Sequence, residues 1–282
     1  MNLKNLLIMA AMSVMAFGFA ACSSDDDDDK DGMLYDDVNS EYNDYVSVCG
    51  IKWARGNLQH LGEDWKIADH QWEYFNYVDG NTGSSISQSS SQMDHFNWGV
   101  CGANALTTSS SVCAKNVSQD ISGKMFTDEA CTAETSDFAA ALYGDIAYWA
   151  TQGTWRLPTQ AELQKLYNEA SYQYGYYTTE DGKNVYGYLF TPPMKSGRVE
   201  NTSARQITDE ELVGGLFLPA TGYRIYPGST ISKSGEVGYY WTSQYRSAGD
   251  NDYAYYLELQ PTQIRWAGNA SYYGRLVRPV KN

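Results

Sequence analysis

Histidine is the side chain that most often acts as an acid or base near neutral pH, and this chain has three of them. They are His60, His70 and His95. No two of them have the H-E-x-x-H spacing that binds zinc on one helix face. His95 directly follows Asp94, so the carboxylate could orient the imidazole as a general base, but neighbouring side chains usually point apart. The histidines therefore predict no catalytic site.

Cysteines can form disulfides, bind metals or act as nucleophiles, depending on their spacing. Four of them follow residue 30, at Cys49, Cys101, Cys113 and Cys131. None has the C-x-x-C spacing that is typical of zinc sites. Four cysteines allow three pairings, and an exported protein can form disulfides, so disulfides and buried free thiols both stay open.

Acidic pairs are the remaining candidates for catalysis or cation binding. Glu210 and Glu211 could act as a carboxylate pair, but "TDEEL" is more simply a solvated helix start. Asp250 and Asp252 are few for Ca²⁺, which takes six to eight oxygen ligands, and we interpret them as a polar turn. No glycine-rich phosphate loop is present. We therefore predict no catalytic residue, no metal ligand and no cofactor.

Ligand contact without reaction has more support, in the C-terminal part of the chain. Sixteen of the 24 tyrosines lie between residues 172 and 282. Tyrosine with Ser, Asn and Arg is the composition of antibody paratopes, because Tyr gives large rigid contacts at low entropic cost. The expected ligand-binding residues are Tyr245, Arg246, Ser247, Asn251, Tyr253, Arg265, Trp266, Asn269, Tyr272 and Tyr273. An ordinary set of aromatic-rich loops is the alternative.

Two helices are predicted upstream of this region. The first has an apolar face formed by Phe138, Leu142, Ile146 and Trp149, with Ser136 as the expected N-cap. The second follows Thr159, which forms a T-x-x-E capping box with Glu162. Leu163 and Leu166 lie on its expected buried face.

Strand patterns follow the helices. Residues 215–222, 238–245, 252–260 and 276–280 are apolar or alternate with a period of two. Residues 80–92 are rich in Gly and Ser and predict a loop. Residues 265–273 are expected to be a connection that carries contact residues, and 276–280 a strand that fixes the C-terminus. Helices followed by antiparallel-type strands predict an α+β fold.

The N-terminus predicts export and a lipid anchor. Lys4 and the apolar stretch to Phe19 form a signal peptide over residues 1–21. Residues 19–22, FAAC, resemble a bacterial lipobox with Cys22 as the lipidated residue. Residues 22–44 would be an acidic flexible tether, since five adjacent aspartates repel one another. The predicted location is the outer membrane, facing the exterior; a plain signal peptide and a generic spacer are the alternatives.

The net charge restricts the class of partner. The formal charge of the whole chain is −14, of which residues 23–30 contribute −4. A basic footprint for nucleic acid is absent, and binding to phosphates or anionic lipids is disfavoured. The expected partner is therefore an unknown protein or glycan at the cell surface.

Eight short motifs occur in a familiar order. They are IKWARGNLQ, WKIADHQWEYF, FNWG, TWRLPTQAEL, FLPATGYR, GYYWTSQY, AYYLEL and LVRPV. Together they resemble the Fibrobacter-type major paralogous domain of Bacteroidetes surface lipoproteins, over about residues 45–282. That family is similar to the C-type lectin and formylglycine-generating-enzyme folds.

The resemblance implies a C-type lectin-like domain over residues 45–282, with two helices and a short, mainly antiparallel twisted sheet. It also implies that the first strand, at 46–53, lies beside residues 276–280. Formylglycine-generating enzymes use a late cysteine pair, and no cysteine follows residue 131 here. Sugar-binding C-type lectins carry a carboxylate beside a proline, where this chain has Gln260-Pro261-Thr262.

The favoured function is an adhesin or receptor-binding module, rather than an enzyme. A narrower version resembles targets of diversity-generating retroelements. Residues 245–257 and 267–280 contain none of the residues that randomised AAY codons exclude, although Trp266 could not arise in this way. The alternatives are a pilus tip subunit, trimmed after Lys30 or Arg55, and a divergent enzyme of the formylglycine-generating fold.

Overall fold

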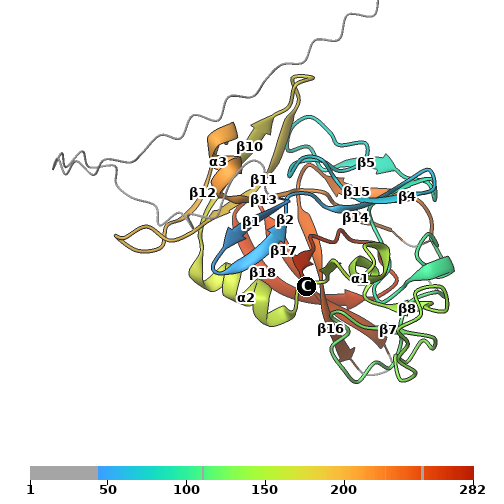
Figure 1. The fold of residues 1–282 in the computed structure, drawn as a ribbon. Helices are drawn as coiled ribbons and strands as arrows, with labels where there is room; N and C mark the ends of the chain where they lie inside the picture. The colour runs from blue at the N-terminus through green and yellow to red at the C-terminus, as the bar shows by residue number, and fades with distance from the viewer. Residues whose placement is uncertain (1–43, 110, 226, 249–250) are drawn as a thin grey trace, which may run out of the picture. The chain divides into compact units, whose positions relative to one another are not determined.

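A computed structural model describes residues 44–109, 111–225, 227–248 and 251–282. The predicted signal peptide, Cys22 and nearly all of the tether lie outside the described residues, as does Asp250 of the predicted turn. The described part is mainly β, with three α-helices and open, mostly antiparallel sheets, as Figure 1 shows. This composition is compatible with the predicted α+β class.

The elements of the described part are short. The helices are the 3₁₀ turn η1 (Gly102–Asn104), α1 (Ile146–Ala150), α2 (Gln160–Glu169) and α3 (Asp209–Gly214). One sheet has the strand order β1 (Tyr45–Val48), β2 (Ile51–Ala54), β19 (Val280–Lys281), β9 (Trp155–Arg156). A second has the order β12 (Glu200–Gln206), β10 (Ser171–Thr178), β11 (Asn184–Thr191), β13 (Leu216–Pro219). A third has the order β16 (Gly238–Ala248), β17 (Asn251–Gln260), β18 (Gln263–Ala270). The smaller sheets are β14 (Tyr223–Arg224), β15 (Thr230–Ser234), β5 (Ser84–Ser87); β4 (Asp64–Ile67), β3 (Leu58–Leu61), β6 (Gln92–Met93); and β7 (Met125–Phe126), β8 (Tyr143–Gly144).

The two ends of the described chain meet in one sheet, as expected. Val280 of β19 pairs with Trp53 of β2, and the C-terminus lies beside the first strands in Figure 1. The prediction of a continuous strand over 276–280 is wrong, however, since β19 begins only at Val280. Pro279 has no N–H for a strand ladder, and Arg278 is buried in a hydrogen-bond network instead.

The second helix is confirmed in its details. The hydroxyl of Thr159 accepts a hydrogen bond from the Glu162 N–H at 3.1 Å, and Glu162 Oε2 accepts one from the Thr159 N–H at 2.8 Å. This capping box satisfies two donors at the start of α2. Leu163 and Leu166 are buried against the core. Local sequence therefore sets both the start and the orientation of α2.

The prediction for the first helix is wrong in its first half. Helix α1 begins at Ile146 with Asp145 as N-cap, rather than after Ser136. Gly144 has a φ of +120°, and a Cβ there would lie 2.4 Å from the carbonyl oxygen of Lys124. This close approach admits only glycine and ends any helix before it. The Asp145 side chain then accepts hydrogen bonds from two N–H groups of the first turn, at 2.9 and 3.0 Å.

The predicted loop at residues 80–92 is also partly wrong, because it contains β5. Ile86 of β5 pairs with the buried Ile231 of β15. The partner strand lies far away in sequence, so the local Gly and Ser content gave no sign of the pairing.

Sheet β16–β18 carries core residues on both faces. Tyr240, Leu257 and Leu259 belong to one hydrophobic cluster, which also includes Leu163 of α2. Tyr239, Trp241 and Tyr256 belong to a second cluster on the other face. The strands predicted at 238–245 and 252–260 are confirmed. Their alternation separates two buried faces in this part of the sheet, rather than an inner and an outer one.

Candidate ligand-binding site

Several of the predicted contact residues lie in a strand rather than in a connection. Arg265, Trp266 and Asn269 belong to β18, which pairs with β17 along its full length from Gln263 to Ala270. The prediction of a connection over 265–273 is therefore wrong for 265–270. Only the turn around Tyr272 and Tyr273 fits it. The small residues of β18 resemble a loop in sequence, but β17 supplies an unbroken partner for hydrogen bonding.

The strand registers place the ten predicted residues on two opposite faces. Residues that pair directly across antiparallel strands share a face. Arg246 pairs with Tyr253, and Trp266 pairs with Leu257. Leu257 is four residues after Tyr253, an even number, so these side chains share one face. The opposite face carries Tyr245, Ser247, Arg265 and Asn269. The prediction of one continuous contact face is therefore wrong.

The face with Arg246 is arranged around Gly268. The guanidinium carbon of Arg246 lies 5.6 Å from the ring centre of Tyr255. A Cβ on Gly268 would lie 2.6 Å from Arg246 Cδ, so the arginine lies flat over the sheet at this glycine. Trp266 packs against the core cluster of α2. This face is held largely by contacts within the protein.

Tyr245 and Asn269, on the other face, also have internal roles. The Tyr245 hydroxyl donates a hydrogen bond to Asp252 Oδ1 at 2.7 Å, and its ring lies 5.8 Å from that of Trp98. Burial and this hydrogen bond raise the pKa of Tyr245 to about 12. Asn269 Oδ1 accepts a hydrogen bond from the N–H of Ala270 at 2.7 Å. The Asn251 side chain lies outside the described residues.

Tyr272 and Tyr273 belong to a cluster of tyrosine rings that the sequence did not predict. We define the tyrosine cluster as Tyr223, Tyr239, Tyr256, Tyr272 and Tyr273. Neighbouring ring centres are 5.1–5.8 Å apart, and most pairs meet edge to face. Tyr239 and Tyr256 are buried, and the other three rings are half-exposed. The cluster therefore presents fixed aromatic rings to solvent on a buried base.

Arg275 lies beneath the tyrosine cluster and is 1 % exposed. Its guanidinium carbon is 4.0 Å from the ring centre of Tyr256 and 4.2 Å from that of Trp241. The rings of Tyr239 and Tyr273 follow at 5.8 and 5.9 Å. Burial lowers the pKa of Arg275. The cation attracts the faces of these rings and so fixes their positions.

Two other buried arginines, Arg278 and Arg224, differ from Arg275 in their hydrogen-bond partners. Arg278 donates to Asn57 Oδ1, to the Ala54 carbonyl and to the Gln71 carbonyl, at 3.0, 3.3 and 2.7 Å. Arg224 likewise donates to a backbone and a side-chain oxygen. Burial lowers the pKa of Arg224 and of Arg278 to about 10. By contrast, Nε and Nη1 of Arg275 have no hydrogen-bond partner among the described residues.

Arg265 borders the tyrosine cluster. Its Nη2 donates to Glu258 Oε1 at 2.9 Å, and Glu258 pairs directly with Tyr239 across the sheet. The Arg265 side chain is 52 % exposed while the Glu258 side chain is 4 % exposed. Of the ten predicted residues, Tyr272 and Tyr273 thus belong to the tyrosine cluster, and Arg265 lies next to it through Glu258. The sequence did contain one sign of the buried Arg275, which is the presence of arginine in the apolar stretch GRLVRPV. Arginine is rarely buried without a specific partner.

The acid–base and metal candidates lie elsewhere. His95 Nδ1 is 2.7 Å from Asp94 Oδ1, so the expectation that these side chains point apart is wrong. Both are fully buried, and His95 Nε2 faces the Thr221 carbonyl at 3.1 Å. Glu210 lies exposed in α3, as expected for a solvated helix start. Within the described ranges, no group of three or more His, Cys, Asp or Glu could hold a metal ion.

The four cysteines of the described part form no disulfide with one another. Cys101, Cys113 and Cys131 are buried. Burial raises the pKa of each of these three thiols, that of Cys131 to about 12. A high thiol pKa keeps the nucleophilic thiolate rare at neutral pH.

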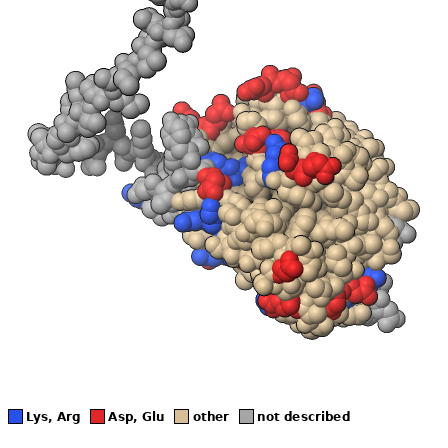
Figure 2. Space-filling model, turned by 45° about the vertical axis from the view of Figure 1, so that its right-hand side comes forward, with Lys and Arg blue, Asp and Glu red and all other residues tan. Residues whose placement is uncertain are grey.

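Charge is distributed unevenly over the surface. On the face drawn in Figure 2, acidic side chains form separate patches, and a broad area between them is uncharged. The helices in the described part are not both long and apolar enough to cross a bilayer.

Comparisons with known proteins add no family assignment. No family model matches the chain, and no curated protein or solved structure matches it significantly.

Proposed function

We propose that the protein is a lipid-anchored cell-surface module with a C-type lectin-like fold, which binds a protein or glycan through the tyrosine cluster and Arg265. The observation that carries this proposal is the set of half-exposed tyrosine rings fixed over the buried Arg275. Rings that are already ordered lose little entropy on binding. The adjacent Arg265 adds a charged, exposed group at the rim, as binding hot spots often combine Tyr and Arg.

A double substitution tests the contact face. Tyr272→Ser with Tyr273→Ser removes two exposed rings from a turn and leaves the sheet in place. Binding of the purified protein to arrays of glycans and surface proteins should fall at least about tenfold, as expected for hot-spot residues. The matched control is Arg246→Ala with Tyr253→Ala on the opposite face, which should bind like the wild type. Loss of binding in the control, with the cluster variant unaffected, would contradict the proposal.

The lipid anchor has a separate test. Cys22→Ser removes the thiol that the lipobox would modify, so the protein should no longer incorporate an alkynyl fatty acid in growing cells. Protease treatment of intact cells should digest the wild-type protein if it faces the exterior. Fatty-acid incorporation by the Cys22→Ser variant would contradict the anchor.

Retroelement diversification is the narrower form of the proposal. It predicts a template repeat and a reverse-transcriptase gene within a few kilobases, with adenine-specific differences between the template and the codons near residues 267–280. Sequencing the surrounding DNA decides it, because the absence of both elements is incompatible with the mechanism.

A further inference from the structure

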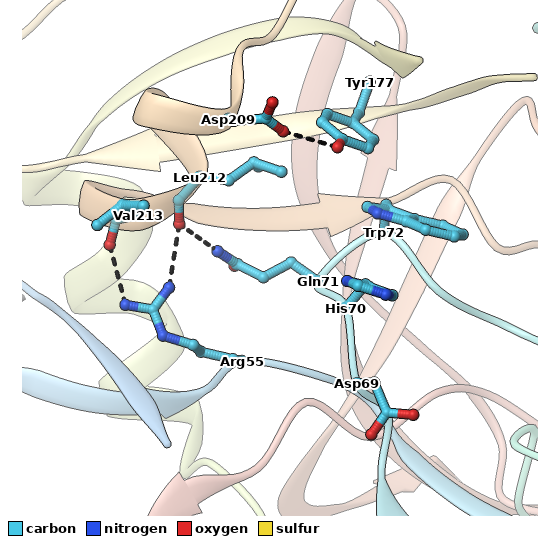
Figure 3. A pocket seen from close by; sticks show the side chains of 9 residues that line it. All are labelled: Arg55, Asp69, His70, Gln71, Trp72, Tyr177, Asp209, Leu212 and Val213. Atoms are coloured by element: carbon cyan, nitrogen blue, oxygen red, sulfur yellow. Dashed lines mark hydrogen bonds between the residues drawn. The ribbon is translucent and has the colours of Figure 1, made fainter. Parts of the chain in front are cut away.

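A pocket lies apart from the proposed contact face. It has a volume of about 170 Å³ and is formed by residues 69–72, Tyr177 of β10 and helix α3, as Figure 3 shows. We call it the Trp72 pocket, after the largest side chain in its wall. None of the ten predicted contact residues lines it. An inference about this pocket therefore goes beyond the proposed function.

Two of the hydrogen-bond donors in the Trp72 pocket, Gln71 and Arg55, are already used by the protein. Gln71 Nε2 donates to the carbonyls of Leu212 and Gly215 at 2.6 and 3.0 Å. Arg55 directs Nη1 and Nη2 to the carbonyls of Leu212 and Val213 at 3.2 and 3.0 Å, as the dashed lines in Figure 3 show. These bonds satisfy the carbonyls at the end of α3. The Arg55 charge is therefore directed to the helix end.

The acceptors of the pocket are not used up. Asp209 Oδ1 accepts a hydrogen bond from the Tyr177 hydroxyl at 2.7 Å. In the described part of the chain, its second oxygen has no hydrogen-bond partner. Asp69, on the opposite side of the opening in Figure 3, has a 73 % exposed side chain and one oxygen 2.9 Å from Lys66 Nζ. The pocket thus offers carboxylate oxygens on two sides of its opening.

Aromatic rings form the remaining wall. The Trp72 ring is stacked with that of His70 at 5.1 Å and with that of Tyr177 at 6.0 Å, with interplanar angles of 6° and 17°. Figure 3 shows His70 and Tyr177 on either side of Trp72. Aromatic rings next to carboxylates attract organic cations, because the ring quadrupole and the negative charge act in the same direction.

We propose that the Trp72 pocket binds the guanidinium or ammonium group of a basic side chain on a peptide or protein partner. Carboxylate oxygens favour a ligand that donates hydrogen bonds and carries a positive charge, and Arg and Lys are such side chains. The volume is about that of five to six liquid waters, which admits one side chain. The chain's net charge of −14 draws cations to the surface.

Calorimetric titration with two matched probes tests this proposal. Nα-acetyl-arginine amide should bind with a dissociation constant on the order of 1 mM. The citrulline analogue has nearly the same shape but no charge, and should bind at least about tenfold more weakly. Binding should also weaken as salt is raised from about 0.05 to 0.5 M, because the pair is partly exposed.

Variants place the binding in the pocket. Asp209→Asn removes the charge and keeps the shape, and should weaken arginine binding at least about tenfold. Asp137→Asn, at an exposed aspartate outside the pocket, should change nothing. Tyr177→Phe removes the hydroxyl that orients Asp209, and serves if Asp209→Asn is misfolded. Equal binding of the two probes, wild-type binding by both pocket variants, or saturable binding of a neutral monosaccharide without arginine binding would each overturn the proposal.

Discussion

Arg275 and Tyr256 form the closest cation–ring contact described in the protein, with 4.0 Å between the guanidinium carbon and the ring centre. This pair lies beneath the tyrosine cluster, where Nε and Nη1 of Arg275 have no hydrogen-bond partner among the described residues. Burying a charged group while two of its three nitrogens lack hydrogen bonds is costly. We infer that Arg275 contributes little net stability and serves mainly to order the rings.

Replacing the buried arginines one at a time should separate these roles. Arg275→Met keeps the length of the side chain and removes the charge, so the free energy of unfolding should change by no more than about 1 kcal/mol. Arg278→Met leaves three buried oxygens without their donor and should cost about 3–5 kcal/mol. Urea unfolding of the two variants and the wild type measures the difference.

Arg275→Met should weaken ligand binding although it changes the stability of the fold little. Without the cation, the rings of Tyr239 and Tyr273 lose the contact that fixes them, so binding to the ligand found on the arrays should weaken. A variant that is strongly destabilised, or that binds as well as the wild type, would argue against the ordering role.

Asp145 should be a strong determinant of stability. Its Oδ2 accepts hydrogen bonds from the N–H groups of Gly123 and Leu157, both at 2.8 Å, in addition to capping α1. Burial raises its pKa to about 6, so at pH 7.5 the side chain is a carboxylate. Asp145→Asn turns an NH₂ group toward buried donors and should cost about 2–4 kcal/mol in the unfolding free energy. Asp137→Asn is the exposed control, with an expected change below about 1 kcal/mol.

The stabilisation by Glu162 should depend on pH. Burial alone raises the pKa of this carboxyl, but hydrogen bonds from Arg156 and Thr159 outweigh it and hold the pKa below its ordinary value of 4.5. Ionised Glu162 therefore stabilises the fold above pH 4.5, and this contribution is lost as the pH falls below that value. Glu162→Gln should cost about 1 kcal/mol at pH 7, and the cost should shrink toward pH 3.5. Denaturant titrations at both pH values check this, with Glu210→Gln as a control that shows no such change.

Thiol labelling should distinguish free cysteines from disulfides. Cys101, Cys113 and Cys131 are buried thiols with raised pKa values, so they should react with iodoacetamide only after the protein is unfolded. Mass spectrometry without a reducing agent should then find all three alkylated. A mass that leaves two of them unmodified in denaturant would indicate a disulfide.

Local sequence predicted the elements that local interactions determine. The capping box of Thr159 and Glu162 and the strand that contains Leu257 were found correctly, because a cap and an alternation are visible within a few residues. Helix α1 was extended too far, because the contact that requires Gly144 comes from Lys124, which directly precedes the partner strand β7. Tertiary contacts of this kind leave no local pattern.

The contact surface was predicted in part, for a similar reason. Composition indicated that Arg265, Tyr272 and Tyr273 are suited to binding, but composition does not specify which face of a strand a residue occupies. A shift of one residue reverses the face in a strand, so Arg265 and Trp266 lie on opposite sides of β18. Tyr223 comes from a separate sheet, and only the tertiary fold brings it to Tyr273.

The position of β19 has a consequence for how the protein is made. This strand follows β2 and β9 in the sequence by more than a hundred residues, yet it lies between them, with Val280 opposite both Trp53 and Arg156. The sheet therefore cannot close until residue 280 has been synthesised. Chains that are truncated before residue 280 would leave Trp53 and Trp155 without their neighbour, and would be more exposed to proteases.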